Sequence, residues 1–266
     1  MTRTTLPHEM INDVTRDVTR DVVRDVIYTA VKTPLEIFGS KIVMLIDPIS
    51  GLATFGVGDK ISKLFASIGG ASFDWAQNTA SIQPDLAVVA GKMNGQRSID
   101  WKGASVGTVM VDGGGAYSAL SDRCDFFSVL QVDTDPPATS TDYGTEQHVS
   151  GQLTAWPDGP SGTCYLSAFT TGFKTIGNPT KNLAAPHLRR QYSVNGEFSC
   201  WINGDLENTF GANTFNNPNS SIAWGTYGSV NFKGQQGITL MLDGEATADE
   251  LGDFHNYINH YYAMGI

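Results

Sequence analysis

The 266-residue chain has few cysteines, few basic residues and no long apolar run. Its three cysteines are an odd number at wide spacings without a Cys-x-x-Cys pair, so neither a disulfide framework nor a zinc knuckle is indicated. We interpret Cys124, Cys164 and Cys200 as buried, reduced thiols. With 17 basic against 27 acidic residues, the formal charge is −10, which argues against nucleic acid as a partner because phosphate binding needs a basic surplus.

The apolar segments are short. None approaches the roughly 20 residues that span a bilayer, and the opening MTRTTLPHEM lacks the apolar centre of a signal peptide. We therefore expect no membrane insertion and synthesis in a reducing cytoplasm. Charged residues make up 17% of the chain and glycines number 29, a composition typical of a turn-rich β protein. One large β domain with an arm accounts for this length.

The arm is predicted over residues 1–40, which contain the four-residue repeat DVTRDVTRDVVRDVI at 13–27. A period of four suits a helix and a strand alike, so the conformation stays open. Its one apolar stripe cannot be buried within so short a segment. The stripe packs on its own domain or, as we favour, serves oligomerisation or docking to a particle. The residues assigned to this docking are Val14, Val18, Val22, Val26, Arg16, Arg20 and Arg24.

Residues 41–266 read as strands and turns that recur at short intervals, a pattern typical of a sandwich. The clearest predicted strands are KIVMLI at 41–46, ISKLF at 61–65, GQRSIDWKG at 95–103, DFFSVLQV at 125–132, YLSAF at 165–169, EFSCWI at 197–202, IAWGTY at 222–227 and ITLMLD at 238–243. The end differs. Thr247 and Glu250 form a capping box, and Leu251, Phe254, Ile258 and Tyr261 follow at helical spacing up to Gly265.

The order of these segments resembles the laminin-G-like, concanavalin A-like jelly rolls of phage structural proteins and bacterial surface proteins. The similarity is carried by VMLIDPIS with GDKISKLF, NGQRSIDWKG, DFFSVLQV, VNGEFSCWINGDL and the ending from Phe232. It implies an all-β, concanavalin A-like jelly-roll sandwich with one C-terminal amphipathic helix and an N-terminal repeat arm. One departure is that the family's usual Glu in the penultimate strand has no match near Ile238. The arm resembles the N-terminal repeats of phage fibre and spike proteins.

The resemblance implies a non-enzymatic virion protein: a tail fibre, head spike or capsid-decoration component that presents a lectin-like domain to host-surface glycans or receptors. Its expected partners are other virion proteins through the arm and further copies of itself. Two alternatives remain open. One is a free or enzyme-associated carbohydrate-binding module, and the other is a polysaccharide depolymerase. Fold alone does not separate them, since function lies in the site.

Catalytic motifs are not evident in the sequence. Residues 103–107 (GASVG) match the pattern GxSxG, but a nucleophile elbow requires a strand-to-helix turn in a parallel sheet, whereas this segment follows a sandwich strand. There is no HExxH, no P-loop, and no paired-carboxylate strand of a retaining glycosidase. We therefore expect no enzymatic activity.

The long polar stretch 133–162 is the candidate ligand surface, because binding residues gather in long loops on rigid scaffolds. Sugar binding needs an aromatic ring for the apolar face of the sugar and polar groups for its hydroxyls. These could come from Tyr143, His148, Trp156 and Asp158. The alternative is that Trp156 plugs the edge of the sandwich. Calcium is the one cofactor considered, since Asp133, Asp135 and Asp142 could supply the oxygen ligands that it prefers, although no fixed loop pattern is present.

Overall fold

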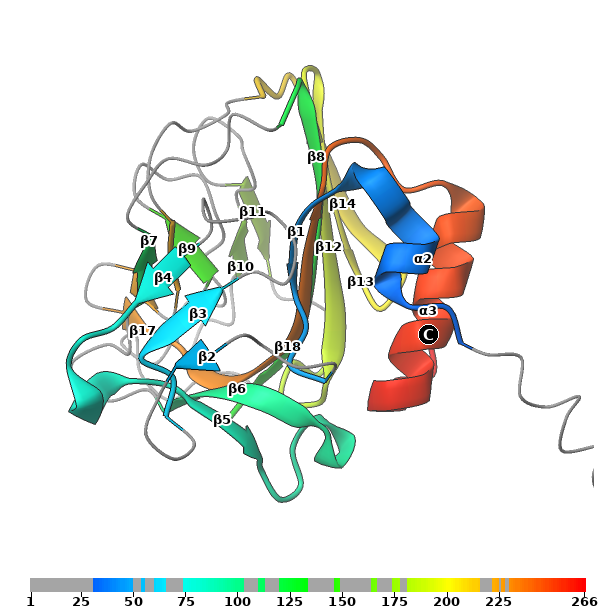
Figure 1. The fold of residues 1–266 in the computed structure, drawn as a ribbon. Coiled ribbons are helices and arrows are strands. Elements are labelled where there is room, and N and C mark those ends of the chain that lie inside the picture. Colours follow the sequence, from blue (N-terminus) through cyan, green and yellow to red (C-terminus); the bar gives the residue numbers. More distant parts are fainter. Residues whose placement is uncertain are drawn as a thin grey trace, which may run out of the picture.

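In the computed structural model of the chain, the described residues are 31–49, 54–55, 60–65, 74–102, 110–112, 120–133, 146–148, 164–166, 174–177, 181–215, 222–224, 226–227 and 230–266. They form a jelly-roll-like β-sandwich with a helical layer on one side (Figure 1). This confirms the predicted all-β class and the C-terminal helix. The repeat at 13–27 lies outside the described residues. Neither helix of the described part is long and apolar enough to cross a membrane.

The larger sheet has eight strands in the order β14-β13-β12-β8-β18-β6-β5, and β1 also pairs with β18. The bounds are β1 Ile42–Ile46, β5 Asp85–Val88, β6 Arg97–Lys102, β8 Arg123–Val132, β12 His187–Val194, β13 Glu197–Ile202, β14 Asp205–Gly211 and β18 Lys233–Leu242. Every pairing in this sheet is antiparallel. The long strand β18 has β8 along one side, while β6 and β1 share the other.

A second sheet of six strands faces the large one, in the order β2-β3-β4-β7-β15-β9 (Figure 1). The bounds are β2 Thr54–Phe55, β3 Lys63–Phe65, β4 Asp74–Ala76, β7 Met110–Asp112, β15 Ile222–Trp224 and β9 Glu146–His148. Two hairpins complete the strands: β10 Cys164–Leu166 with β11 Lys174–Gly177, and β16 Thr226–Tyr227 with β17 Val230–Asn231. Short 3-10 turns lie at Gly39–Lys41, Ala80–Ile82 and Met93–Gly95.

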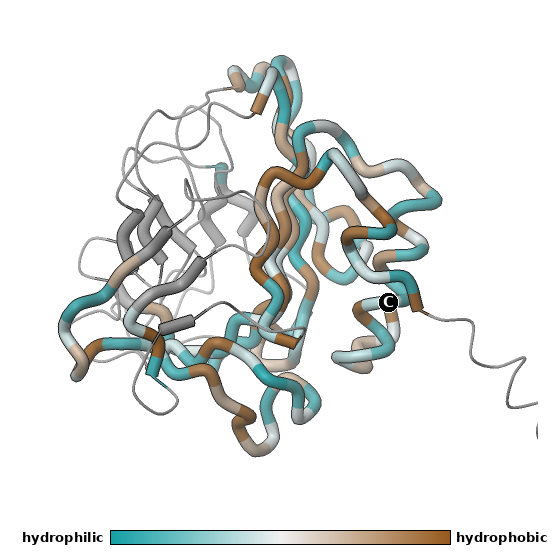
Figure 2. The backbone as a smooth tube through the Cα atoms, viewed as in Figure 1, coloured by the Kyte–Doolittle hydropathy of each residue, from teal (hydrophilic) through white to brown (hydrophobic). Residues whose placement is uncertain are grey.

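Strand β8 lies between two hydrophobic cores, because alternate residues of a strand point to opposite faces. Phe126 and Leu130 belong to the core between the sheets, and Phe127 and Val129 to the core beneath the helices. Burial on both faces explains why its sequence is a nearly continuous apolar run. Figure 2 shows the apolar colouring concentrated along the central strands, while the two helices alternate apolar and polar positions.

Helix α3 (Ala248–Tyr262) begins with the predicted capping box, in which Thr247 accepts from the backbone N–H of Glu250 and the Glu250 side chain accepts from that of Thr247. The side chains that it buries on the large sheet are Phe254, Tyr257, Ile258 and Tyr262. The helix ends at Tyr262, earlier than the expected stop at Gly265. Ala263 adopts the left-handed conformation that closes it.

A short helix α2 (Pro34–Phe38) uses the same capping device, with Thr33 and Glu36. Phe38 packs against Phe254 of α3 with ring centroids 5.3 Å apart, and Lys32 pairs with Asp253 at 2.7 Å. The last residues of the predicted arm are therefore packed on the domain, and Pro34 starts a helix there. Where the repeat itself lies stays a prediction.

Candidate functional site

Most of the sequence-predicted site residues lie outside the described residues. These are Tyr143, Trp156, Asp158, Asp135 and Asp142, the arm residues Val14, Val18, Val22, Val26, Arg16, Arg20 and Arg24, and the segment 103–107. His148 ends β9, where its backbone pairs with Ile222 of β15. The glycan site at 133–162 and the arm therefore remain predictions.

Asp133, the first residue of the polar loop, is described. Its backbone N–H donates to the carbonyl oxygen of Lys233 at 3.0 Å, and its carboxylate lies 3.2 Å from Nζ of Lys92. The structure thus pairs this carboxylate with a lysine at the base of the loop. Within the part of the chain that the structure describes, no three His, Cys, Asp or Glu side chains are grouped as metal ligands. The calcium site stays a prediction, since Asp135 and Asp142 are not described.

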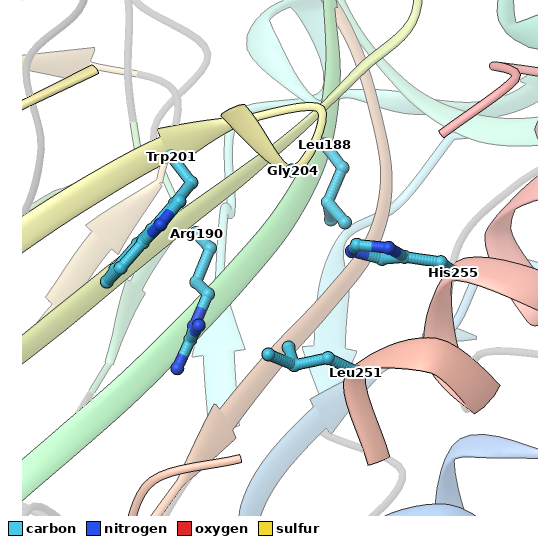
Figure 3. Close-up of a pocket in the computed structure, with 6 residues that line it drawn as sticks. All are labelled: Leu188, Arg190, Trp201, Gly204, Leu251 and His255. Carbon is cyan, nitrogen blue, oxygen red and sulfur yellow. The ribbon is translucent and has the colours of Figure 1, made fainter. Parts of the chain in front are cut away.

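The described residues include a pocket that the sequence did not predict, between α3 and the face of the large sheet that the helix covers. Its volume is about 110 Å³. Figure 3 shows side chains converging on it from β12, from β13 and from α3. The lining residues are Leu188, Arg190, Trp201, Gly204, Leu251 and His255.

The back of the pocket is an ion pair. Nε of Arg190 lies 2.9 Å from Oδ1 of Asp125 and Nη2 lies 2.7 Å from Oδ2, a bidentate arrangement. Oδ2 also accepts from the backbone N–H of Ala246 at 3.0 Å. Burial raises the pKa of Asp125, while the hydrogen bonds and charge of Arg190 act against that rise. Asp125 therefore joins three places: its own strand β8, the neighbouring strand β12, and the turn that precedes α3.

Arg190 is also held between aromatic rings. Its Cζ lies 4.4 Å from the ring centroid of Trp201 and 5.6 Å from that of Phe127, distances at which a guanidinium is attracted to the ring face. Glu245, whose side chain is 55% exposed, approaches Nη2 at 3.7 Å. These contacts fix the guanidinium in one orientation, which is what a preformed recognition group requires.

His255 forms the wall on the helix side. Burial lowers its pKa, and the positive charge of Arg190 lowers it further, so the imidazole is neutral at pH 7. The opposite wall is the turn at Gly204, where φ is +83° and a Cβ would lie 3.4 Å from Cε1 of His255. Glycine at this position therefore suits the left-handed turn, and the turn lies in van der Waals range of the helix.

Comparison with known proteins gives structural likeness only. No protein-family profile and no curated protein matches the chain. Domain 4 of an extracellular arabinanase from Geobacillus stearothermophilus, solved in complex with arabinotriose, has a TM-score of 0.53 at 13% identity, covering 81% of this chain and 98% of that domain. An arabinofuranosidase complexed with arabinofuranosyl-α-1,2-xylobiose has a TM-score of 0.56 at 11% identity, covering 87% of this chain and 65% of that one.

The binding domain of botulinum neurotoxin serotype D is also structurally similar, with a TM-score of 0.50 at 10% identity, covering 85% of this chain and 53% of that one. At such identities the comparisons establish the fold. The chain is a jelly-roll-like β-sandwich of the type found in glycoside hydrolase chains solved with sugars and in a toxin binding domain.

Proposed function

We propose that this chain is a non-enzymatic virion protein of a bacteriophage whose β-sandwich binds a glycan on the host surface. The observation that carries the glycan part is the match to domain 4 of the arabinanase. That domain was solved with arabinotriose, and the likeness extends over 98% of it. The likeness thus spans one whole domain, and sandwich domains of this type place their binding residues in loops on a rigid scaffold.

The glycan surface that we propose is the stretch 133–162, which includes strand β9 of the smaller sheet. Tyr143 and Trp156 supply aromatic faces for sugar rings, and His148 and Asp158 supply groups for hydroxyls. The start of this stretch is fixed on the large sheet, because Asp133 is bonded to both Lys233 and Lys92.

The glycan proposal is tested on a glycan array with the full chain. Wild-type protein is expected to bind a defined set of glycans, and Trp156→Ala and Tyr143→Ala are each expected to lose most of the signal. The matched control is Trp156→Phe, which keeps an aromatic plate and should retain binding. Signals that survive both alanine substitutions would remove the loop from the proposal.

The virion part of the proposal concerns the arm. The Asp-Val-Thr-Arg repeat gives residues 13–27 one apolar stripe, flanked by charges of both signs. Val31, which follows the repeat, packs on the core beneath the helices. We propose that the repeat assembles several copies and attaches them to other virion proteins.

The arm is tested by light scattering after size exclusion on the full chain. Replacing Val14, Val18, Val22 and Val26 by Ser is expected to convert an oligomer into a monomer, because the stripe is then polar. Replacing Thr15 and Thr19 by Ala is the control and should leave the mass unchanged. A wild-type monomer contradicts the oligomer, and the chain is then better explained as a free carbohydrate-binding module.

A depolymerase is the second candidate, since two of the structural likenesses are to chains of glycoside hydrolases. Release of reducing sugar from host surface polysaccharide distinguishes it from the proposed binding protein. We expect no release. Turnover that depends on this chain would overturn the non-enzymatic assignment and direct the search to paired carboxylates.

A further inference from the structure

The pocket between α3 and the large sheet combines three apolar side chains with two polar groups. Leu188, Leu251 and Trp201 line it together with Arg190 and His255 (Figure 3). Sites for small ligands commonly combine an apolar lining with a few placed polar groups. These five residues belong to β12, β13 and α3, so none is part of the loop at 133–162.

Two polar groups at the pocket have unused hydrogen-bonding capacity. Arg190 donates to Asp125 through Nε and Nη2, and its Nη1 makes no hydrogen bond to a described residue. The ring nitrogens of His255 likewise make none within the described part of the chain. A neutral imidazole has one donor and one acceptor, and a guanidinium has donors alone. The pocket therefore offers donors and one acceptor.

The charges around the pocket do not favour an anion. Asp125 and Glu245 both lie within 4 Å of the Arg190 guanidinium, so two carboxylates face one cation. An anionic ligand needs surplus positive charge or several free N–H groups. A ligand that is uncharged and carries groups able both to donate and to accept fits better.

We propose that this pocket is a second glycan site, which binds one uncharged sugar unit between α3 and the β12–β13 face of the sheet. A hydroxyl of the sugar accepts from Nη1 of Arg190, another bonds the imidazole of His255, and the apolar face of the ring lies against Leu188 and Leu251. This inference rests on the proposed glycan binding. The volume of about 110 Å³ is small beside ordinary ligand sites of roughly 300 to 1,000 Å³, so the pocket holds a single unit.

The site is tested on the ¹⁵N-labelled full chain by titration with free D-galactose, D-glucose and L-arabinose. N-acetylneuraminic acid serves as the charged comparator. At least one neutral sugar is expected to shift the indole signal of Trp201, assigned from its loss in Trp201→Phe, and the charged sugar is expected to leave it unchanged. A shift caused by the charged sugar alone would overturn the uncharged ligand class.

Two variants act on the pocket without removing the Asp125–Arg190 pair. His255→Ala removes a polar group and should weaken binding about tenfold, the effect of one hydrogen bond of roughly 1.4 kcal/mol. Leu251→Trp fills the space and should abolish binding. His260→Ala is the control, since His260 is exposed and lies outside the pocket. Spectra of each variant report whether the fold is retained.

The outcomes separate this inference from the proposed function. If the glycans bound on the array are lost in Trp156→Ala and unaffected in Leu251→Trp, the pocket is not a site and the proposed function stands. If neutral sugars shift Trp201 in Trp156→Ala as in wild type, the pocket binds independently of the loop. If neither the array nor the titration detects a sugar, both proposals are wrong.

Discussion

Asp125 and Arg190 form a buried ion pair across neighbouring strands: the Asp125 side chain is fully buried, and its carboxylate is held at 2.7 Å and 2.9 Å by the guanidinium. The pair lies between the sandwich and the helical layer. It orients the one cation that lines the pocket.

Asp125→Ala is expected to lower the free energy of unfolding by about 3 to 5 kcal/mol, because it leaves the buried Arg190 with the largely exposed Glu245 as its remaining counter-charge. Urea denaturation measures the change. Asp122→Ala is the control, since Asp122 pairs with Arg123 at the surface and exposed pairs contribute little. Equal effects for the two variants would show that the buried pair has no special role.

Gly237 and Tyr262 are in tight contact. A Cβ at position 237 would lie 2.7 Å from Oη of Tyr262, which accepts from the backbone N–H of Ile238 at 3.0 Å. Gly237→Ala should therefore cost about 1 to 3 kcal/mol through overpacking. Gly252→Ala is the matched control on α3, where a Cβ meets nothing within 4 Å, and should stabilise the chain by roughly 0.5 to 1 kcal/mol.

The same contact is tested by a double-mutant cycle. Tyr262→Phe leaves the N–H of Ile238 without its acceptor and should cost about 1 to 3 kcal/mol. Combining it with Gly237→Ala should cost less than the sum of the two single changes, since the displaced hydroxyl is already absent. The ring carbon Cζ of Tyr262, 2.9 Å from such a Cβ, remains in the phenylalanine variant, so additive effects, measured by urea denaturation, would contradict a clash with the hydroxyl.

Stability should fall with acid partly through His255. Its pKa is lowered in the folded chain, so below about pH 6.5, the ordinary value, the unfolded chain binds more protons and is favoured. The loss begins near pH 6.5 and continues down to the lowered pKa of the folded state. In His255→Gln the decline from pH 7.5 to pH 5 should be shallower than in wild type and in the control His260→Gln. Parallel curves for all three proteins would contradict the assignment.

The cap of α3 contributes to stability through one hydroxyl. Thr247→Ala should lower the melting temperature and cost about 1 kcal/mol, because the N–H of Glu250 loses its acceptor. Thr247→Ser keeps the oxygen and should recover most of this loss. A serine variant as unstable as the alanine variant would indicate that the threonine methyl group matters instead.

Apolar strands and the final helix could be predicted from sequence because their patterns are local. The run 125–132 became β8, and the capping box began α3 where expected. Strand β12 was missed because its sequence HLRRQYSV carries adjacent arginines. Arg189 and Arg190 point to opposite faces of the sheet, and both are buried. Arg190 is paired with an aspartate 65 residues earlier in the chain, a pairing that no local pattern indicates.

The pocket could not be predicted for a related reason. The strand of Trp201 and the helix of His255 were both predicted, but nothing in either segment indicates that the helix lies across that strand. They meet at the turn of Gly204, whose positive φ suits glycine and whose Cβ, if present, would be in van der Waals contact with His255.

The pairing of β1 with β18 has a consequence for folding. Ile42 lies opposite Leu242, and β18 also borders β8 and β6, so three earlier strands depend on a strand made after all of them. Contacts of such long sequence separation slow folding. During synthesis, the middle of the large sheet cannot form before residues 233–242 have been made. Until then the apolar edges of the earlier strands stay exposed. Expression at lower temperature or with chaperones should therefore raise the yield of folded chain.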